Sequence, residues 1–96
     1  MTATLVFQIE IDAPEKLAAY REGAGAALAK HGGAVTAASP APAAFDPGGT
    51  RSEGPGMLAV LTFPDMAAAQ AWIDDPALAE LHALRNAAGA AQVWAL

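Results

Sequence analysis

The chain contains no cysteine, and this absence excludes disulfide bonds and thiolate metal ligands. Basic residues are also scarce, with five Lys and Arg against ten Asp and Glu, for a formal net charge of −5. The five basic residues are scattered, so we expect no surface that follows the phosphates of a nucleic acid. The lack of thiols suits a reducing compartment, and we predict a cytoplasmic protein.

Long apolar runs are missing as well. No run approaches the roughly 20 residues that span a bilayer, and residues 1–10 lack the basic start of a signal peptide. We therefore expect neither a membrane partner nor a leader segment. Alanine inflates the hydrophobic fraction of 54% and contributes helix propensity more than burial. The sequence predicts one small domain, residues 1–96, in which a partner subunit would add apolar burial.

The first third of the chain predicts a strand and a helix. Residues Thr4–Ile11 alternate with a period of two, which is typical of a half-buried strand with one apolar face. The following Asp12-Ala13-Pro14-Glu15 predicts a helix with Asp12 as its cap and Pro14 in its first turn. This helix is expected to run to about Lys30 and to end at the glycines 32–33.

A second unit with the same order begins at Met57. A buried strand, Met57–Phe63, stops at a proline, and Asp65 is expected to cap the next helix. Its predicted apolar anchors, at helical spacing, are Met66, Ala69, Trp72 and Ile73. The pair Asp75-Pro76 predicts a break and a further helix, and Ala90–Ala95 predicts the last strand.

The two units are joined by a weak strand, Ala34–Ala38, and a connection of 18 residues, Ser39–Gly56, with four Pro and four Gly. Such composition predicts a long irregular loop. Its one large apolar side chain is Phe45. We expect Phe45 to attach the loop to the body or to lie in a disordered loop, rather than to cover a pocket.

The element order is therefore β-α-β-β-α-β, which predicts an α+β, ferredoxin-like fold: a four-stranded antiparallel sheet with the helices on one face. The opposite face would carry Val6, Trp94 and part of the strand 57–63. Because a bare apolar sheet face is an aggregation hazard or an interface, we expect a homodimer in which two such faces form a barrel with a cavity beside each sheet.

Five segments carry a resemblance to a known family. They are Leu5–Asp12, Pro14 with Tyr20-Arg21, Lys30-His31-Gly32-Gly33, Phe63-Pro64-Asp65-Met66 with Ala71-Trp72, and Asp75-Pro76 to Leu81 and Arg85. With these segments the chain resembles the bacterial family known as domain of unknown function 1330, in the dimeric α/β-barrel superfamily. The resemblance implies the fold and a dimer, but no established reaction. The Ala/Pro-rich loop, Ile73 and Asp75 depart from the family pattern.

Two groups of side chains are candidate ligand contacts. Gln8, Glu10, Gln92 and Trp94 share the sheet face turned away from the helices, where they could orient a small ligand, form interface hydrogen bonds or reach solvent at the strand ends. The second group is Tyr20, Arg21, Trp72 and Arg85, in which Arg85 could hold a carboxylate. The alternative is that Tyr20 and Trp72 are core anchors and that the arginines pair with acids such as Glu22 or Glu80.

The two histidines, His31 and His82, are candidate general bases near neutral pH. The alternatives are a helix-capping role for His31 and, for His82, a position at the surface or at the edge of the apolar stripe of the last helix. Neither lies in a metal-binding spacing, and no phosphate loop or catalytic triad spacing is present. We therefore predict no metal and no organic cofactor.

Two classes of function remain open from the sequence. The first is binding or conversion of a small hydrophobic, oxygenated metabolite in the dimer cavity, with Glu10 or His31 as base, Arg85 as carboxylate or oxyanion partner, and Trp72 and Trp94 as cavity wall. The second is a non-catalytic dimerisation or binding module, or an accessory subunit of a larger complex. The residues alone leave open whether any reaction is catalysed.

Overall fold

The computed structural model describes residues 2–50 and 56–96. The elements are β1 (Ala3–Ile11), α1 (Pro14–Lys30), β2 (Ala34–Ser39), β3 (Met57–Phe63), α2 (Met66–Asp74), the 3₁₀ helix η1 (Pro76–Leu78), α3 (Ala79–Ala87) and β4 (Gly89–Ala95). This order confirms the predicted β-α-β-β-α-β plan with a broken second helix. None of the helices in the described residues is long and apolar enough to cross a membrane.

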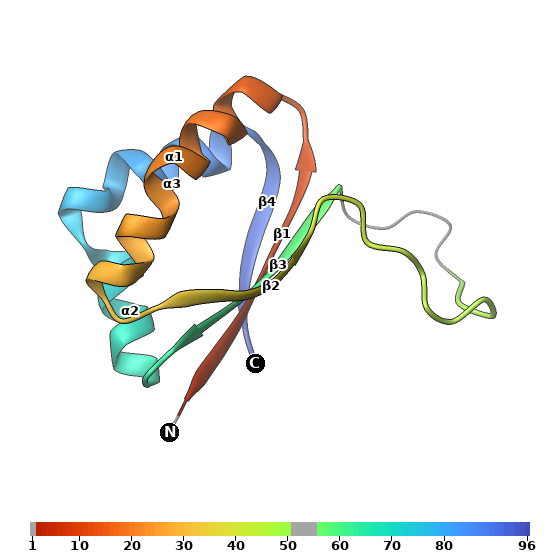
Figure 1. The fold of residues 1–96 in the computed structure, drawn as a ribbon. Helices are drawn as coiled ribbons and strands as arrows, with labels where there is room; N and C mark the ends of the chain where they lie inside the picture. The colour runs from red at the N-terminus through yellow and green to blue at the C-terminus, as the bar shows by residue number, and fades with distance from the viewer. Residues whose placement is uncertain (1, 51–55) are drawn as a thin grey trace.

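The four strands form one sheet in the order β2-β3-β1-β4, and all three neighbouring pairs are antiparallel. The helices cover one face of this sheet and leave the other face open (Figure 1). The predicted α+β, ferredoxin-like fold is thereby confirmed. The sheet of a single chain stays open, with β2 and β4 as its edges, so a barrel requires a second sheet.

The strand register separates the two faces. Phe7 lies opposite Ala59 and Val93, and it is buried against the helices. Because side chains alternate along a strand, the neighbouring positions face the other way. Gln8 lies opposite Leu58 and Gln92 on this outer face. The predicted division of β1 into an inner and an outer face is therefore confirmed.

The start of α1 differs from the prediction. Asp12 does not cap the helix: no side chain caps α1, and the backbone N–H groups of Asp12 and Ala13 donate to the Ala88 carbonyl at 2.9 Å each. Pro14, the first helical residue, has no N–H to satisfy, which lessens the need for a cap. The end of α1 follows the prediction, with Gly32 at a φ of 74°, the left-handed conformation that glycine adopts most readily.

The corner before α2 follows the prediction more closely. The Asp65 carboxylate accepts from the Ala68 N–H at 2.8 Å, and Asp75 caps η1 by accepting from the Ala77 N–H at 2.9 Å. Two predicted anchors of α2 are not buried. Met66 and Ile73 are 48% and 38% exposed, because this nine-residue helix turns only one narrow stripe toward the sheet. Ala69 and Trp72 form that stripe.

Gly89 explains how closely β4 follows α3. A side chain at this position would overlap the backbone carbonyl of Glu10, so only glycine allows β4 to pair with β1 immediately after the helix. The sequence pattern placed this glycine at the helix end and the strand start at Ala90. The strand begins one residue earlier, at Gly89 itself.

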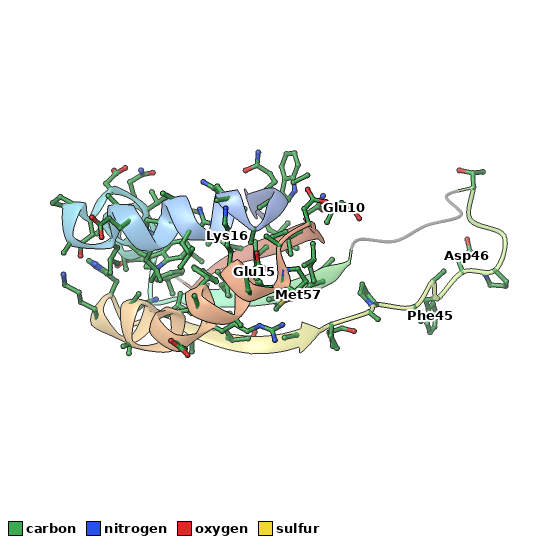
Figure 2. The ribbon with its side chains drawn as sticks, turned by 90° about the horizontal axis from the view of Figure 1, so that it is seen from above. Glu10, Glu15, Lys16, Phe45, Asp46 and Met57 are labelled. Carbon is green, nitrogen blue, oxygen red and sulfur yellow. The ribbon has the colours of Figure 1, made fainter. Side chains whose placement is uncertain are left out.

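The segment 40–50 projects away from the body (Figure 2). Phe45 is fully exposed, so the expectation that it attaches the loop to the body is wrong, and it covers neither of the cavities described below. The segment contains its own small turn, in which the Asp46 carboxylate accepts from the Gly48 N–H at 2.9 Å. Residues 51–55 of the predicted loop lie outside the described residues.

Candidate functional site

Two cavities lie between the helices and the inner face of the sheet. The first, which we call the α1 cavity, has a volume of about 390 Å³. The second, the β4 cavity, has a volume of about 380 Å³ and lies against α2, α3 and β4. Trp72 and Val93 line both cavities. Both volumes fall within the roughly 300–1,000 Å³ of small-molecule sites.

The α1 cavity is almost entirely apolar. Residues of all four strands and of α1 form its wall, among them Phe7, Tyr20, Ala24, Leu28, Ala59 and Leu61. Among the described residues, Arg21 is the one charged residue that lines it, and its guanidinium Nη2 lies 3.0 Å from the sulfur of Met57. Arg21 is exposed, and it does not form the alternative ion pair with Glu22. The cavity is therefore shaped for a hydrophobic molecule.

The β4 cavity combines apolar and polar walls. Leu5, Ile73 and Val93 contribute hydrocarbon, whereas Gln70, Arg85 and Asn86 contribute polar groups. The exposed side chains of Met66 and Ile73, which the sequence pattern placed in the core, form part of this wall. A molecule with an apolar body and one polar group fits such a lining.

Trp72 is the side chain that the two cavities share, and it is only 1% exposed. Its ring packs on Phe63 and meets the edge of His82, with centroids 5.5 and 4.8 Å away. The indole Nε1 has no hydrogen-bond partner among the described residues. A buried N–H without an acceptor is costly, which makes this atom a candidate contact for a bound molecule.

Arg85 is buried, with 4% of its surface exposed. The guanidinium carbon lies 5.8 to 6.0 Å from the ring centroids of Trp72, Tyr20 and Phe7. Cation–π attraction to these rings offsets part of the cost of removing the charge from water. No carboxylate in the described part of the chain lies within ion-pair distance of it, so the alternative of a pair with Glu80 is wrong.

His82 holds Arg85 in place. It is buried, so of its two alternative positions, at the surface or at the edge of the apolar stripe, the surface position is wrong. Its Nε2 lies 3.0 Å from the Trp72 carbonyl and must donate there, which leaves Nδ1 to accept from the Arg85 Nη1 at 3.1 Å. Burial lowers the pKa of His82, and the charge of Arg85 lowers it further, so the ring is neutral at pH 7. The i, i+3 spacing of His82 and Arg85 was the sequence signal for this contact.

The predicted outer-face group lies elsewhere. Gln8, Gln92 and Trp94 are on the open side of the sheet, with Trp94 half exposed and opposite Val6. Glu10 is exposed near the end of β1, close to the C-terminal end of α3 (Figure 2). The sheet therefore separates Gln8, Glu10 and Trp94 from Tyr20, Trp72 and Arg85, which the structure does bring together. Gln92, on the edge strand β4, also lines the β4 cavity with Trp72 and Arg85.

His31 takes part in an ion cluster at the end of α1. Its Nε2 lies 2.9 Å from the Asp75 carboxylate, and the Lys30 ammonium lies 2.6 Å from the same oxygen. Lys30, then His31, then the Ala77 N–H hold the pKa of Asp75 well below its usual range. His31 lines neither of the two cavities. Within residues 2–50 and 56–96, no three His, Asp or Glu side chains gather as a metal site.

Comparisons with solved structures show the same fold in proteins of distant sequence. A protein of unknown function from Rhodopseudomonas palustris aligns with a TM-score of 0.81 at 20% identity, over 99% of this chain and 80% of its own. A dimeric ferredoxin-like protein of unknown function from Jannaschia sp. CCS1 aligns with a TM-score of 0.70 at 17% identity, over 100% and 98%.

A third structure is SnoaB, a cofactor-independent oxygenase from Streptomyces nogalater. It aligns with a TM-score of 0.69 at 11% identity, over 99% of this chain and 90% of its own. No protein with a curated description matches the sequence. The family model described as a domain of unknown function (DUF1330) matches residues 2–96, and the chain therefore belongs to this family.

Proposed function

We propose that the protein binds a small hydrophobic, oxygen-containing metabolite in the α1 cavity, without an organic cofactor. The observation that carries this proposal is a cavity of about 390 Å³ with a nearly continuous apolar wall inside a domain of only 96 residues. The cavity opens to solvent beside the exposed residues Arg21, Gly25 and Val35, so its apolar wall is in contact with water that an apolar occupant would displace.

Conversion of the bound molecule is a further part of the proposal. One protein with this fold is described as a cofactor-independent oxygenase, but a shared fold does not fix a shared reaction. Of the three candidate catalytic residues, Arg85 lies beside a cavity, whereas Glu10 and His31 lie outside both. Chemistry in the β4 cavity would therefore depend on Arg85 rather than on Glu10 or His31 of the same chain.

A homodimer is the assembly that we propose. The outer face of the sheet carries Val6, Leu58 and Val60, and beside them the half-exposed Trp94. A second copy of the chain would cover this apolar face and close the barrel. The Jannaschia protein of the same fold is described as dimeric. This face also favours the second candidate function, a dimerisation module without a ligand.

A cavity-filling variant tests the binding proposal, with 1-naphthol as the probe and calorimetry as the measurement. Ala24 is half-buried on α1 and lines the α1 cavity, so Ala24→Leu would place three further carbon atoms in it. We expect wild type to bind 1-naphthol and Ala24→Leu to lose at least about tenfold in affinity.

The matched control is Gly25→Ala, on the same helix and beside the same cavity. A Cβ atom at Gly25 meets no atom within 4 Å, so this variant keeps the cavity and gains helix propensity. It should bind 1-naphthol like the wild type. Equal affinity in wild type and Ala24→Leu, or no binding of apolar probes by any form, would overturn the proposal in favour of the dimerisation module.

A further inference from the structure

Two buried donors without an anionic partner among the described residues, the Arg85 guanidinium and the indole N–H of Trp72, belong to side chains that line the β4 cavity. We propose that this cavity is a second binding site, which takes a small carboxylate on an apolar body and holds its anionic group with these two donors. The site is distinct from the apolar α1 cavity and shares only Trp72 and Val93 with it.

The charge of Arg85 is the first reason. A buried cation is stable only when it is paired or well bonded, and Arg85 has three aromatic rings, one amide oxygen and one neutral imidazole around it. Its Nη2 makes no hydrogen bond within the described residues. A carboxylate can bind a planar guanidinium with strong charge-assisted hydrogen bonds. An anion at Nη2 would supply the missing negative charge.

The unsatisfied Trp72 Nε1 is the second and independent reason. The indole N–H can only donate a hydrogen bond, and it is fully buried. The centroid of the Trp72 ring lies 5.8 Å from the guanidinium carbon of Arg85. One ligand group that accepts from both side chains would satisfy both. A carboxylate has two oxygens with several acceptor sites, and it therefore suits two donors on neighbouring side chains.

The remaining lining restricts the chemical class of the ligand. Within residues 2–50 and 56–96, the cavity wall carries no charge apart from Arg85, and Leu5, Ile73 and Val93 provide an apolar surface for the rest of the molecule. A monoanion is neutralised by one guanidinium, whereas a phosphate dianion would leave one buried charge uncompensated. The site therefore selects a small monocarboxylate with an aromatic or aliphatic body.

His82 acts as a positioning residue for this site. Its Nδ1 accepts a hydrogen bond from the Arg85 Nη1 at 3.1 Å. The Asn86 Oδ1 accepts one from the Arg85 Nε at 3.2 Å. Both contacts fix the plane of the guanidinium and leave Nη2 for the ligand. His82 itself carries no charge at pH 7, so it does not compete for the anion.

The test is a titration of ¹⁵N-labelled protein with benzoate, and with the neutral amide benzamide as the matched compound. The chain has two tryptophans and therefore two indole N–H signals. The variant Trp94→Phe, at a half-exposed position, lacks one of these signals and thereby assigns both. We expect benzoate to move the Trp72 signal in a saturable way and to leave the Trp94 signal in place. Benzamide should bind about tenfold more weakly or worse.

Arg85→Met keeps the volume and the apolar contacts but removes the charge, and a well-packed apolar replacement of a buried charge can fold normally. This variant should lose the preference for benzoate over benzamide. Equal binding of the two compounds by wild type, a Trp72 signal unmoved by benzoate, or an unchanged preference in Arg85→Met would each overturn the proposal. If Arg85→Met does not fold, the comparison of benzoate with benzamide on the wild type still tests the proposal.

The same titration, applied to two variants, distinguishes benzoate binding in the β4 cavity from binding in the α1 cavity. Ala24→Leu fills the α1 cavity and should bind benzoate as wild type does, while Arg85→Met should keep its affinity for 1-naphthol. Loss of benzoate binding in Ala24→Leu would assign the carboxylate to the α1 cavity and overturn the second site. A failure of 1-naphthol binding alone would count against the proposed function and leave the carboxylate site standing.

Discussion

At the scale of single residues, the site depends on groups that are buried in spite of their polarity. Arg85 and His82 lie on one face of α3 and are only 4% and 7% exposed. A charged residue on a short helix is usually solvated, and the sequence pattern alone favours that interpretation. Burial of this pair follows from Trp72, Tyr20 and Phe7, whose rings come together only after the sheet and helices pack.

His82 predicts a pH dependence of stability. Its ordinary pKa is 6.5, and burial lowers this pKa in the folded chain. As the pH falls below about 6.5, the unfolded chain takes up more protons at this site than the folded one, so the free energy of unfolding decreases. We expect urea unfolding to show a loss of stability between pH 7.5 and 5.5.

The variant His82→Gln keeps a donor and an acceptor but has no group that titrates in this range. The loss of stability on acidification should be smaller in this variant than in wild type. All other titratable groups are common to both proteins, so the difference between the two curves isolates His82. Parallel curves would show that His82 is as easily protonated in the folded chain as in the unfolded one.

At the scale of elements, the local signals in the sequence were sufficient for most of the fold. Alternation predicted β1, and the corner residues Asp65 and Asp75 predicted where α2 and η1 begin. The cap at Asp12 failed because Ala13 takes the N-cap position and leaves Asp12 one residue before it. The N–H groups of Asp12 and Ala13 fix this corner by donating to the carbonyl of Ala88, just after α3 and 76 residues from Asp12. A contact between distant segments is invisible to local capping rules.

The contacts of Asp75 between the end of α1 and η1 predict a second pH effect on stability. Asp75 binds Lys30 and His31 at the end of α1 and also caps η1. These contacts lower its pKa in the folded chain, so the stability that they provide is present above the ordinary value of 3.8 and is lost as the pH falls below it. Asp75→Asn keeps an oxygen for the Ala77 N–H but has no charge for the other two groups.

We therefore expect Asp75→Asn to melt below the wild type at pH 7. The gap in melting temperature should narrow as the pH falls below about 3.8, because protonation then removes the same charge from the wild type. Thermal melts followed by circular dichroism over this range provide the measurement. A difference in melting temperature that is the same at every pH would mean that the charge of Asp75 does not stabilise the contacts between α1 and η1.

At the scale of the whole molecule, the sheet has two apolar faces and the helices cover only one (Figure 1). The prediction that the open face carries Val6 and Trp94 is confirmed by the register of β1 and β4. The cavities could not be predicted, because their walls combine residues from α1, α2, α3 and all four strands. Element order gives the layers of a fold, whereas the spaces between layers depend on side-chain packing.

The open face predicts a charge-sensitive assembly. Trp94 is 52% exposed in the single chain, so Trp94→Lys should leave the fold of that chain intact. In a dimer that covers this face, the same change would bury a Lys ammonium without a partner. Sedimentation equilibrium should therefore show a dimer for the wild type and a monomer for Trp94→Lys.

The control for this experiment is Ala79→Lys, which adds the same charge at an exposed position of α3 on the helical side. It should sediment like the wild type. A monomeric wild type, or a Trp94→Lys variant that sediments as a dimer, would show that a second copy does not cover the open face.

The position of β1 also bears on how the chain folds as it is synthesised. β1 is made first, yet it pairs on one side with β3 and on the other with β4, so that Leu5 meets Leu61 and Ala95. Contacts between segments so far apart require the closure of long loops, which slows folding. On the ribosome, β1 therefore has an unpaired edge until residues 89–95 have emerged. During that interval the nascent chain is at its most prone to aggregate.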